Sequence, residues 1–100
     1  MIIYNITVNV ENDVREEWLQ WMKEVHIPHV MNTGLFLANQ IYKVLVDDED
    51  GATYSIQYQC RNMNDYEKYR DEFAPTMQAE TQKKYKDRFV AFRTLLEKVG

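Results

Sequence analysis

The sequence predicts an α+β fold in which a four-stranded antiparallel sheet carries its helices on one face. Three observations predict it. Apolar residues alternate in strand-like segments, they recur at helical spacing between those segments, and the resulting order is strand, helix, strand, strand, helix, strand. With right-handed crossovers, this order gives one antiparallel sheet with the helices on a single side.

The first strand is predicted at about residues 2–10, where apolar and polar side chains alternate. Its two faces are Tyr4, Ile6, Val8 and Val10 on one side, and Asn5, Thr7 and Asn9 on the other. We expect the apolar side to face the helices, because a sheet buries its apolar face against another layer.

A helix is predicted to follow, because Asp13 and Glu16 have the spacing of a capping box. Apolar residues then recur at helical spacing and form one stripe: Val14, Trp18, Trp21, Met22 and Val25. Pro28 disrupts the regular hydrogen bonding of this helix, and Gly34 suits a left-handed C-cap.

The second half of the sequence supplies the remaining strands. A strand at about residues 35–46 is followed by an acidic turn at residues 47–51 and by a third strand at residues 53–60. The third strand repeats the alternation of the first, with Tyr54, Ile56, Tyr58 and Cys60 on one face. The last strand, at about residues 89–96, places Val90, Phe92 and Leu96 on one side.

Two further helical segments are predicted between the third and the last strand. Asn62 or Asn64 can cap the first of them, and Pro75 fits the first turn of the second. The complete order is therefore the βαββαβ arrangement of ferredoxin-like folds.

The sheet face that the helices leave open carries no charged residue on the first and third strands. Its residues are Ile3, Asn5, Thr7 and Asn9 on the first strand and Thr53, Ser55, Gln57 and Gln59 on the third. Uncharged amides and hydroxyls suit a surface that is partly dehydrated but still needs hydrogen bonds. We therefore expect a homodimer whose sheets pack face to face and close a dimeric α+β barrel. The alternative is a solvated polar face.

The composition limits the class of protein. A chain of 100 residues suits a single domain, which we expect to span residues 1–100. The net charge of −4 argues against nucleic acid as a partner, and no apolar run is long enough to cross a membrane. Cys60 is the only cysteine and the first segment reads as a strand rather than a signal peptide, so we expect a cytoplasmic protein.

Both histidines, His26 and His29, lie near the predicted end of the first helix. An imidazole between a helix and a sheet can act as a general acid or base, so His26 is the best catalytic candidate and both histidines are candidate ligand-binding residues. The alternative is structural, because histidines near a helix C-terminus interact with its free carbonyls. No third His or Cys ligand lies nearby in the sequence, so we expect no metal.

Trp18 and Trp21 are candidate walls of a ligand pocket, because an indole can stack on a planar ligand. The same spacing also suits two core residues. The sequence contains no glycine-rich phosphate loop and no GxSxG or HExxH pattern, and we expect no cofactor.

Several spaced motifs give the chain a resemblance to a known family. They are Met-Ile-Ile-Tyr-Asn-Ile-Thr-Val-Asn-Val at the start, Trp-Leu-Gln-Trp-Met, His-Ile-Pro and Thr-Gly-Leu-Phe in the first helical region, Thr-Tyr-Ser-Ile-Gln-Tyr in the third strand, and Arg-Phe-Val-Ala-Phe-Arg-Thr near the end. Over essentially its whole length the chain resembles the bacterial domain-of-unknown-function family 4286. That resemblance implies a dimeric α+β barrel and no established activity.

More distantly, the chain resembles the wider dimeric α+β barrel group, which includes small monooxygenases, haem-degrading enzymes and lactone isomerases. This resemblance implies ligand binding between the sheet and the helices, with His26 on the first helix and Asn5 on the first strand as matching positions. Haem-degrading members place an axial histidine in the second helical region. Residues 65–85 contain no histidine, which argues against conventional haem ligation.

Three hypotheses about function remain open at this point. The first is a small-molecule-binding dimeric barrel that takes a small aromatic or apolar ligand beside His26. The second is a cofactor-independent monooxygenase or isomerase with His26 as general base. The third is a protein-interaction or structural module with a closed core.

Overall fold

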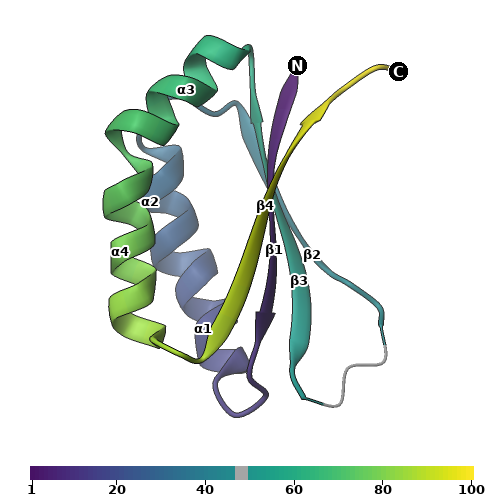
Figure 1. Cartoon of the computed structure of the whole chain (residues 1–100), viewed down its shortest axis with the longest axis vertical. Coiled ribbons are helices and arrows are strands. Elements are labelled where there is room, and N and C mark those ends of the chain that lie inside the picture. Colours follow the sequence, from purple (N-terminus) through teal and green to yellow (C-terminus); the bar gives the residue numbers. More distant parts are fainter. Residues whose placement is uncertain (47–49) are drawn as a thin grey trace.

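A computed structural model describes residues 1–46 and 50–100 of the chain. It contains one four-stranded sheet in the order β2-β3-β1-β4, and each neighbouring pair of strands is antiparallel. The helices lie together on one face of this sheet (Figure 1). The predicted ferredoxin-like α+β fold is therefore confirmed.

The central strand of the sheet is β1 (Ile2–Val10), which pairs along its whole length with β3 (Ala52–Cys60) and β4 (Phe89–Glu97). The edge strand β2 (Ala38–Lys43) is shorter than the predicted segment. Residues directly opposite each other in antiparallel strands share a face. The predicted turn at residues 47–51 depends on residues 47–49, which lie outside the described part of the chain.

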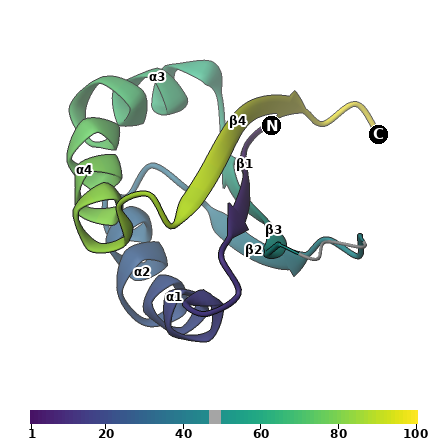
Figure 2. The same cartoon turned by 60° about the horizontal axis from the view of Figure 1, so that its bottom comes forward.

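The first helical region is continuous but changes its winding. It consists of α1 (Arg15–Trp21), a π-helical segment η1 (Met22–His26) and α2 (Ile27–Met31). Pro28 lies in α2 directly after η1, where it lacks the backbone N–H that a helix would use for its next hydrogen bond. The second region consists of α3 (Met63–Glu72) and α4 (Ala74–Tyr85). Figures 1 and 2 show both regions on the same side of the sheet.

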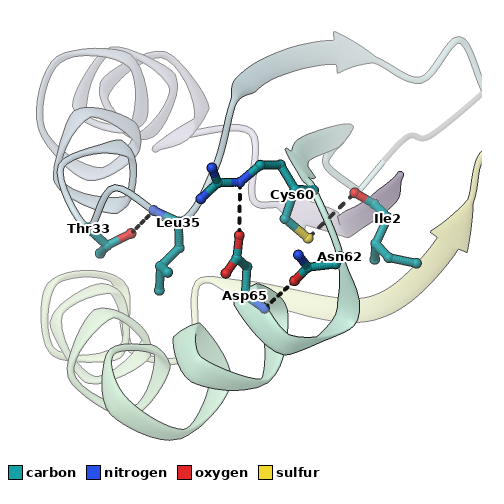
Figure 3. Close-up of polar contacts among 7 residues, drawn as sticks. Ile2, Thr33, Leu35, Cys60, Asn62 and Asp65 are labelled. Carbon is teal, nitrogen blue, oxygen red and sulfur yellow. Dashed lines mark hydrogen bonds and ion pairs between the residues drawn. The ribbon is translucent and has the colours of Figure 1, made fainter.

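Local hydrogen bonds end one helix and begin another, as Figure 3 shows. The hydroxyl of Thr33 accepts a hydrogen bond from the backbone N–H of Leu35, and Gly34 between them has a φ of 77°. The Asn62 side chain accepts a hydrogen bond from the N–H of Asp65 and so caps α3. The predicted cap at Asn62 is confirmed. Gly34 has the predicted left-handed conformation, but the C-cap of α2 is Asn32, two residues earlier.

The predicted capping box at Asp13 and Glu16 is wrong. The N-cap of α1 is Val14, and no side chain caps this helix. The Asp13 carboxylate instead accepts a hydrogen bond from the guanidinium of Arg88, which also binds Glu11. The ion pairs with Arg88 hold the carboxylate that would otherwise cap the helix.

The predicted apolar stripe of the first helix is only partly correct. Trp18 and Met22 are buried as predicted, whereas Val25 is 47% exposed and Ile27 is buried in its place. Met22 and Ile27 are five residues apart, which suits a π-helical turn rather than the three or four residues of an α-helix. The extra residue of η1 rotates Val25 toward solvent.

The outer face of the sheet is uncharged on all four strands. The register of β4 and β2 with their neighbours adds the following residues to those predicted for β1 and β3: Ala38, Gln40, Tyr42, Val90, Phe92, Thr94 and Leu96. Several of these apolar side chains are exposed, and Phe92 is 70% exposed. No element among residues 1–46 and 50–100 covers this face in Figures 1 and 2.

Candidate functional site

A cavity of about 270 Å³ lies between the inner face of the sheet and the helices. Side chains from β1, β3 and β4 form one side of it, and side chains from both helical regions form the other. An engineered apolar cavity of about 150 Å³ holds benzene, so this cavity has room for roughly two fused rings. Ligand sites in proteins are typically concave, largely apolar and furnished with a few polar groups.

The buried part of the cavity contains two polar groups without a protein partner. Trp18 is 1% exposed and Tyr58 is 2% exposed, and both line the cavity. The Trp18 Nε1 and the Tyr58 hydroxyl form no hydrogen bond with any residue in the described part of the chain. An unpaired buried polar group costs roughly 1–3 kcal/mol. Both atoms have almost no accessible surface, so they are enclosed by neighbouring protein atoms rather than open to the cavity.

The Tyr58 hydroxyl is a neutral group. Burial, together with the neighbouring Tyr69 and Tyr4, raises its pKa far above the usual value of a tyrosine. It can therefore donate or accept a hydrogen bond, whereas the Trp18 N–H can only donate. Burial likewise raises the pKa of Tyr69, which also lines the cavity.

The opening of the cavity is polar. Gln78 and Gln82 on α4 and Arg93 on β4 line the cavity and are also exposed to solvent. Residues that meet both conditions mark where the cavity reaches the surface. Arg93 donates a hydrogen bond from Nε to the Tyr4 hydroxyl, at 3.2 Å, which orients its guanidinium.

His26 contributes the one imidazole of the cavity lining. Burial lowers its pKa from 6.5 to about 4, with smaller lowering effects from His29 and Arg93 and an opposing effect from Glu80. His26 is therefore neutral at physiological pH.

The tautomer of His26 is linked to Thr81 on α4. The Thr81 Oγ1 lies 3.4 Å from His26 Nδ1 and also donates to the Met77 carbonyl, at 3.3 Å. A threonine hydroxyl has one proton, so both hydrogen bonds form together only when His26 Nδ1 carries the ring proton and donates to Thr81. In that tautomer Nε2 is a hydrogen-bond acceptor.

The π-helical segment η1 supplies both Met22 and His26 to the cavity. Single π-helical turns inside α-helices occur frequently at functional sites. The extra residue lets the helix keep Trp18 and Ile27 in the core on either side of this turn. His26 therefore reaches the cavity from a segment whose winding differs from that of the rest of the helix.

The structure places the sequence-predicted site residues in four locations, the fourth being the outer sheet face that carries Asn5. His26 and Trp18 line the cavity. Trp21 does not line it, but its ring packs against His26, with centroids 5.3 Å apart. His29 is exposed, and its Nδ1 lies 3.3 Å from a carboxylate oxygen of Glu80.

Asn5 lies on the outer face of the sheet, away from the cavity. Its side chain accepts a hydrogen bond from the Ser55 hydroxyl, at 2.7 Å, and donates one to Thr7, at 3.2 Å. Asn5 and His26 are therefore on opposite sides of the sheet, and the structure does not bring them together.

Sequence analysis did not single out Arg93 or Thr81, and it treated Tyr58 as packing. A signal for Arg93 exists in the sequence, because it alternates with Phe89 and Ala91 on the face of β4 that meets the helices. A cation on the inner face of a strand is an informative exception to burial rules. Thr81 has no comparable signal, because its role depends on the distance to a residue in another helix.

Within residues 1–46 and 50–100, no group of three or more His, Cys, Asp and Glu residues is arranged to hold a metal ion. No helix in these two ranges has the length and apolar character needed to cross a bilayer. Cys60 is buried, and burial raises the pKa of its thiol. Its thiol donates to the Ile2 carbonyl, at 3.6 Å, a contact drawn in Figure 3, so Cys60 has a packing role between β3 and β1.

The sheet order and the cavity between sheet and helices define the class as a ferredoxin-like α+β protein. Within that class, the chain belongs to the family described as "Domain of unknown function (DUF4286)", whose model matches residues 1–99. The predicted resemblance is thereby confirmed. No curated protein matches the chain.

Solved structures with low sequence identity share the fold. A dimeric ferredoxin-like protein from an uncultured marine organism is 15% identical to this chain, with a TM-score of 0.70; the match covers 100% of this chain and 96% of that protein. A MhuD variant with two manganese protoporphyrin IX molecules bound per active site is also 15% identical, with a TM-score of 0.70; the match covers 99% of this chain and 95% of that protein. A putative antibiotic biosynthesis monooxygenase from Deinococcus radiodurans is 12% identical, with a TM-score of 0.68; the match covers 100% of this chain and 94% of that protein. Identities this low show the fold alone.

Proposed function

We propose that this protein is a small-molecule-binding dimeric α+β barrel whose ligand occupies the cavity beside His26. The observation that carries the proposal is the cavity of about 270 Å³ itself, where apolar side chains are accompanied by the neutral imidazole of His26 and the guanidinium of Arg93. Ligand sites in proteins typically combine a concave apolar lining with a few polar groups of this kind.

A cavity-filling substitution tests this proposal. Ala91 on β4 lines the cavity, and Ala91→Leu reduces its volume, whereas Ala79→Leu places the same side chain on an exposed position of α4. We expect aromatic ligands to quench tryptophan fluorescence in the wild type and in Ala79→Leu, and to bind much more weakly to Ala91→Leu. Equal binding by all three proteins would exclude the cavity as the site.

The homodimer is the second part of the proposal. The outer sheet face carries no charge and exposes Phe92. Some of its polar side chains bond to one another: Asn5 bonds to Ser55 and Thr7, and Asn9 bonds to Thr53. Such a face can be dehydrated without leaving those groups unpaired. The dimeric ferredoxin-like protein of the same fold supports this arrangement by analogy.

Phe92→Glu tests the dimer, because it introduces a charge at the most exposed aromatic side chain of the uncharged face. Met63→Glu, at an exposed position in the first turn of α3, is the matched control. Analytical ultracentrifugation should give a dimer for the wild type and the control and a monomer for Phe92→Glu. A wild type that sediments only as a monomer at micromolar concentration would exclude the dimer.

A cofactor-independent monooxygenase or isomerase is the alternative, and one observation favours it. His26 is neutral and, when Nδ1 donates to Thr81, presents Nε2 as an acceptor, which is the form that a general base requires. The pKa of about 4 makes it a weak base, however, so ligand binding has the better support. Once a substrate is known, full turnover by His26→Ala would exclude this alternative.

The hypothesis of a closed interaction module is the least supported of the three. It requires a core without a connected cavity at His26, whereas His26 lines a cavity with a polar opening. A cytoplasmic location stays a prediction from the sequence.

A further inference from the structure

The side chains that line the cavity carry charge of one sign only, and this bears on the chemistry of its ligand. At neutral pH Arg93 is the one formally charged side chain among the described residues that line it. No carboxylate in the described part of the chain lies within ion-pair distance of this guanidinium. An acidic protein with a net charge of −4 therefore presents an uncompensated cation at the opening of its main cavity.

The orientation of Arg93 is determined by one hydrogen bond. Its Nε donates to Tyr4, whereas its two terminal nitrogens have no hydrogen bond to any residue between 1 and 46 or between 50 and 100. A guanidinium edge of this kind binds a carboxylate through two parallel N–H donors. Arginine is also better suited than lysine to such planar, two-point recognition.

The inner face of the sheet extends from Arg93 across two neighbouring strands. Arg93 on β4 is opposite Ile6 on β1, and Ile6 is opposite Ile56 on β3, two residues from Tyr58. Neighbouring strands are about 4.8 Å apart, so the row from Arg93 to Ile56 spans about 10 Å. A two-ring aromatic acid spans a similar length.

The walls between the two ends are apolar and aromatic. They include Ile6, Val8, Met22, Val30 and Phe89.

We infer that the cavity takes an aromatic carboxylate of about two rings, whose carboxylate pairs with Arg93 and whose rings lie among the apolar side chains. This inference rests on the proposed small-molecule function and names its ligand class. An uncharged ring system of the same size would leave Arg93 unused.

Isothermal titration calorimetry with three probes tests the inference: 6-hydroxy-2-naphthoate, 2-naphthoate and 2-naphthol. We expect both naphthoates to bind about tenfold more tightly than 2-naphthol, because a charge-assisted hydrogen bond is the strong kind. Arg93→Gln should abolish that difference. Arg70→Gln, at an exposed arginine of α3 that pairs with Asp71, should preserve it.

The remaining outcomes separate the ligand class from the proposed function. If 2-naphthol binds as tightly as the naphthoates and Arg93→Gln changes neither affinity, the carboxylate class is wrong while the cavity remains a binding site. If none of the three probes binds to the wild type, both the ligand class and the small-molecule function are overturned.

Discussion

The indole of Trp21 packs against the imidazole of His26, with ring centroids 5.3 Å apart and planes inclined by 31°. The same indole meets the ring of Tyr85 in an edge contact, at 5.6 Å. Trp21 thus covers a residue of the cavity without lining the cavity itself. Trp21 therefore affects the site by keeping water away from the imidazole of His26.

Trp21→Leu should raise the pKa of His26. Burial is the largest cause of the lowering to about 4, and the smaller side chain admits water to the imidazole. We expect the pKa to move toward 6.5, the value of an exposed histidine. NMR titration of the His26 ring protons measures it directly, and the exposed His29 serves as an internal reference in the same spectra. An unchanged pKa would show that other side chains keep His26 dry.

The free energy of unfolding should fall as the pH is lowered from about 6.5 to about 4. The folded-state pKa of His26 is lowered, so the unfolded state binds more protons in this window and stability rises with pH. The contribution is complete above the unfolded-state pKa and changes by at most about 1.4 kcal/mol per pH unit within the window.

Urea denaturation of the wild type and His26→Gln at several pH values measures this contribution. The difference between their pH slopes isolates His26 from the other titrating groups near it, which are Glu80, His29 and Arg93. Parallel slopes for the two proteins between pH 4 and 6.5 would contradict the prediction.

The fold was predictable because its signals are local and repeated. Alternation in the segments of β1 and β3 correctly assigned the inward residues from Tyr4 to Val10 and from Tyr54 to Cys60, although it missed the buried Ala52 at the start of β3. The cap at Asn62 and the left-handed conformation of Gly34 were readable for the same reason. The predicted cap at Asp13 was the exception, because its partner Arg88 is distant in sequence and no local pattern indicates this ion pair.

The candidate site was predictable only in part. His26 and Trp18 stood out by residue type, and both line the cavity. Trp21 was indistinguishable from Trp18 by spacing, because the α-helical count does not anticipate the π-helical turn that follows it. The hydrogen bond between Thr81 and His26 joins residues far apart in the chain, so only the packed structure brings it to light.

The two interior glycines should respond differently to substitution by alanine. Gly34 has a φ of 77° and open space around it, so Gly34→Ala should cost about 1 kcal/mol from the backbone alone. At Gly51 an added Cβ would lie 2.7 Å from the Val10 carbonyl oxygen and 2.7 Å from the Asn9 side chain. We expect Gly51→Ala to lower the melting temperature further than Gly34→Ala, as measured by calorimetry. The reverse order would show that the strand end at Gly51 shifts easily.

Deleting Glu24 should be tolerated, although deletions inside helices normally are not. The π-helical segment η1 has one residue more than an α-helix needs, so its loss leaves Met22 and Ile27 four residues apart on one α-helical face. The exposed Glu24 loses only a side chain that accepts a hydrogen bond from Gln20. Deleting the exposed Ala79 from the regular helix α4 is the control, because it turns the following residues by about 100° and removes Tyr85 from the core.

We expect the Glu24 deletion to remain folded, with a loss in the free energy of unfolding of about 1 kcal/mol, and the Ala79 deletion to lose several times as much or to fail to fold. Circular dichroism with urea denaturation measures both. The Glu24 deletion should nevertheless weaken aromatic ligands, because the π-helical turn carries both Met22 and His26 to the cavity. Retained stability with unchanged binding would show that the altered winding does not serve the site, whereas equal destabilisation by the two deletions would mean that η1 is a required part of the fold.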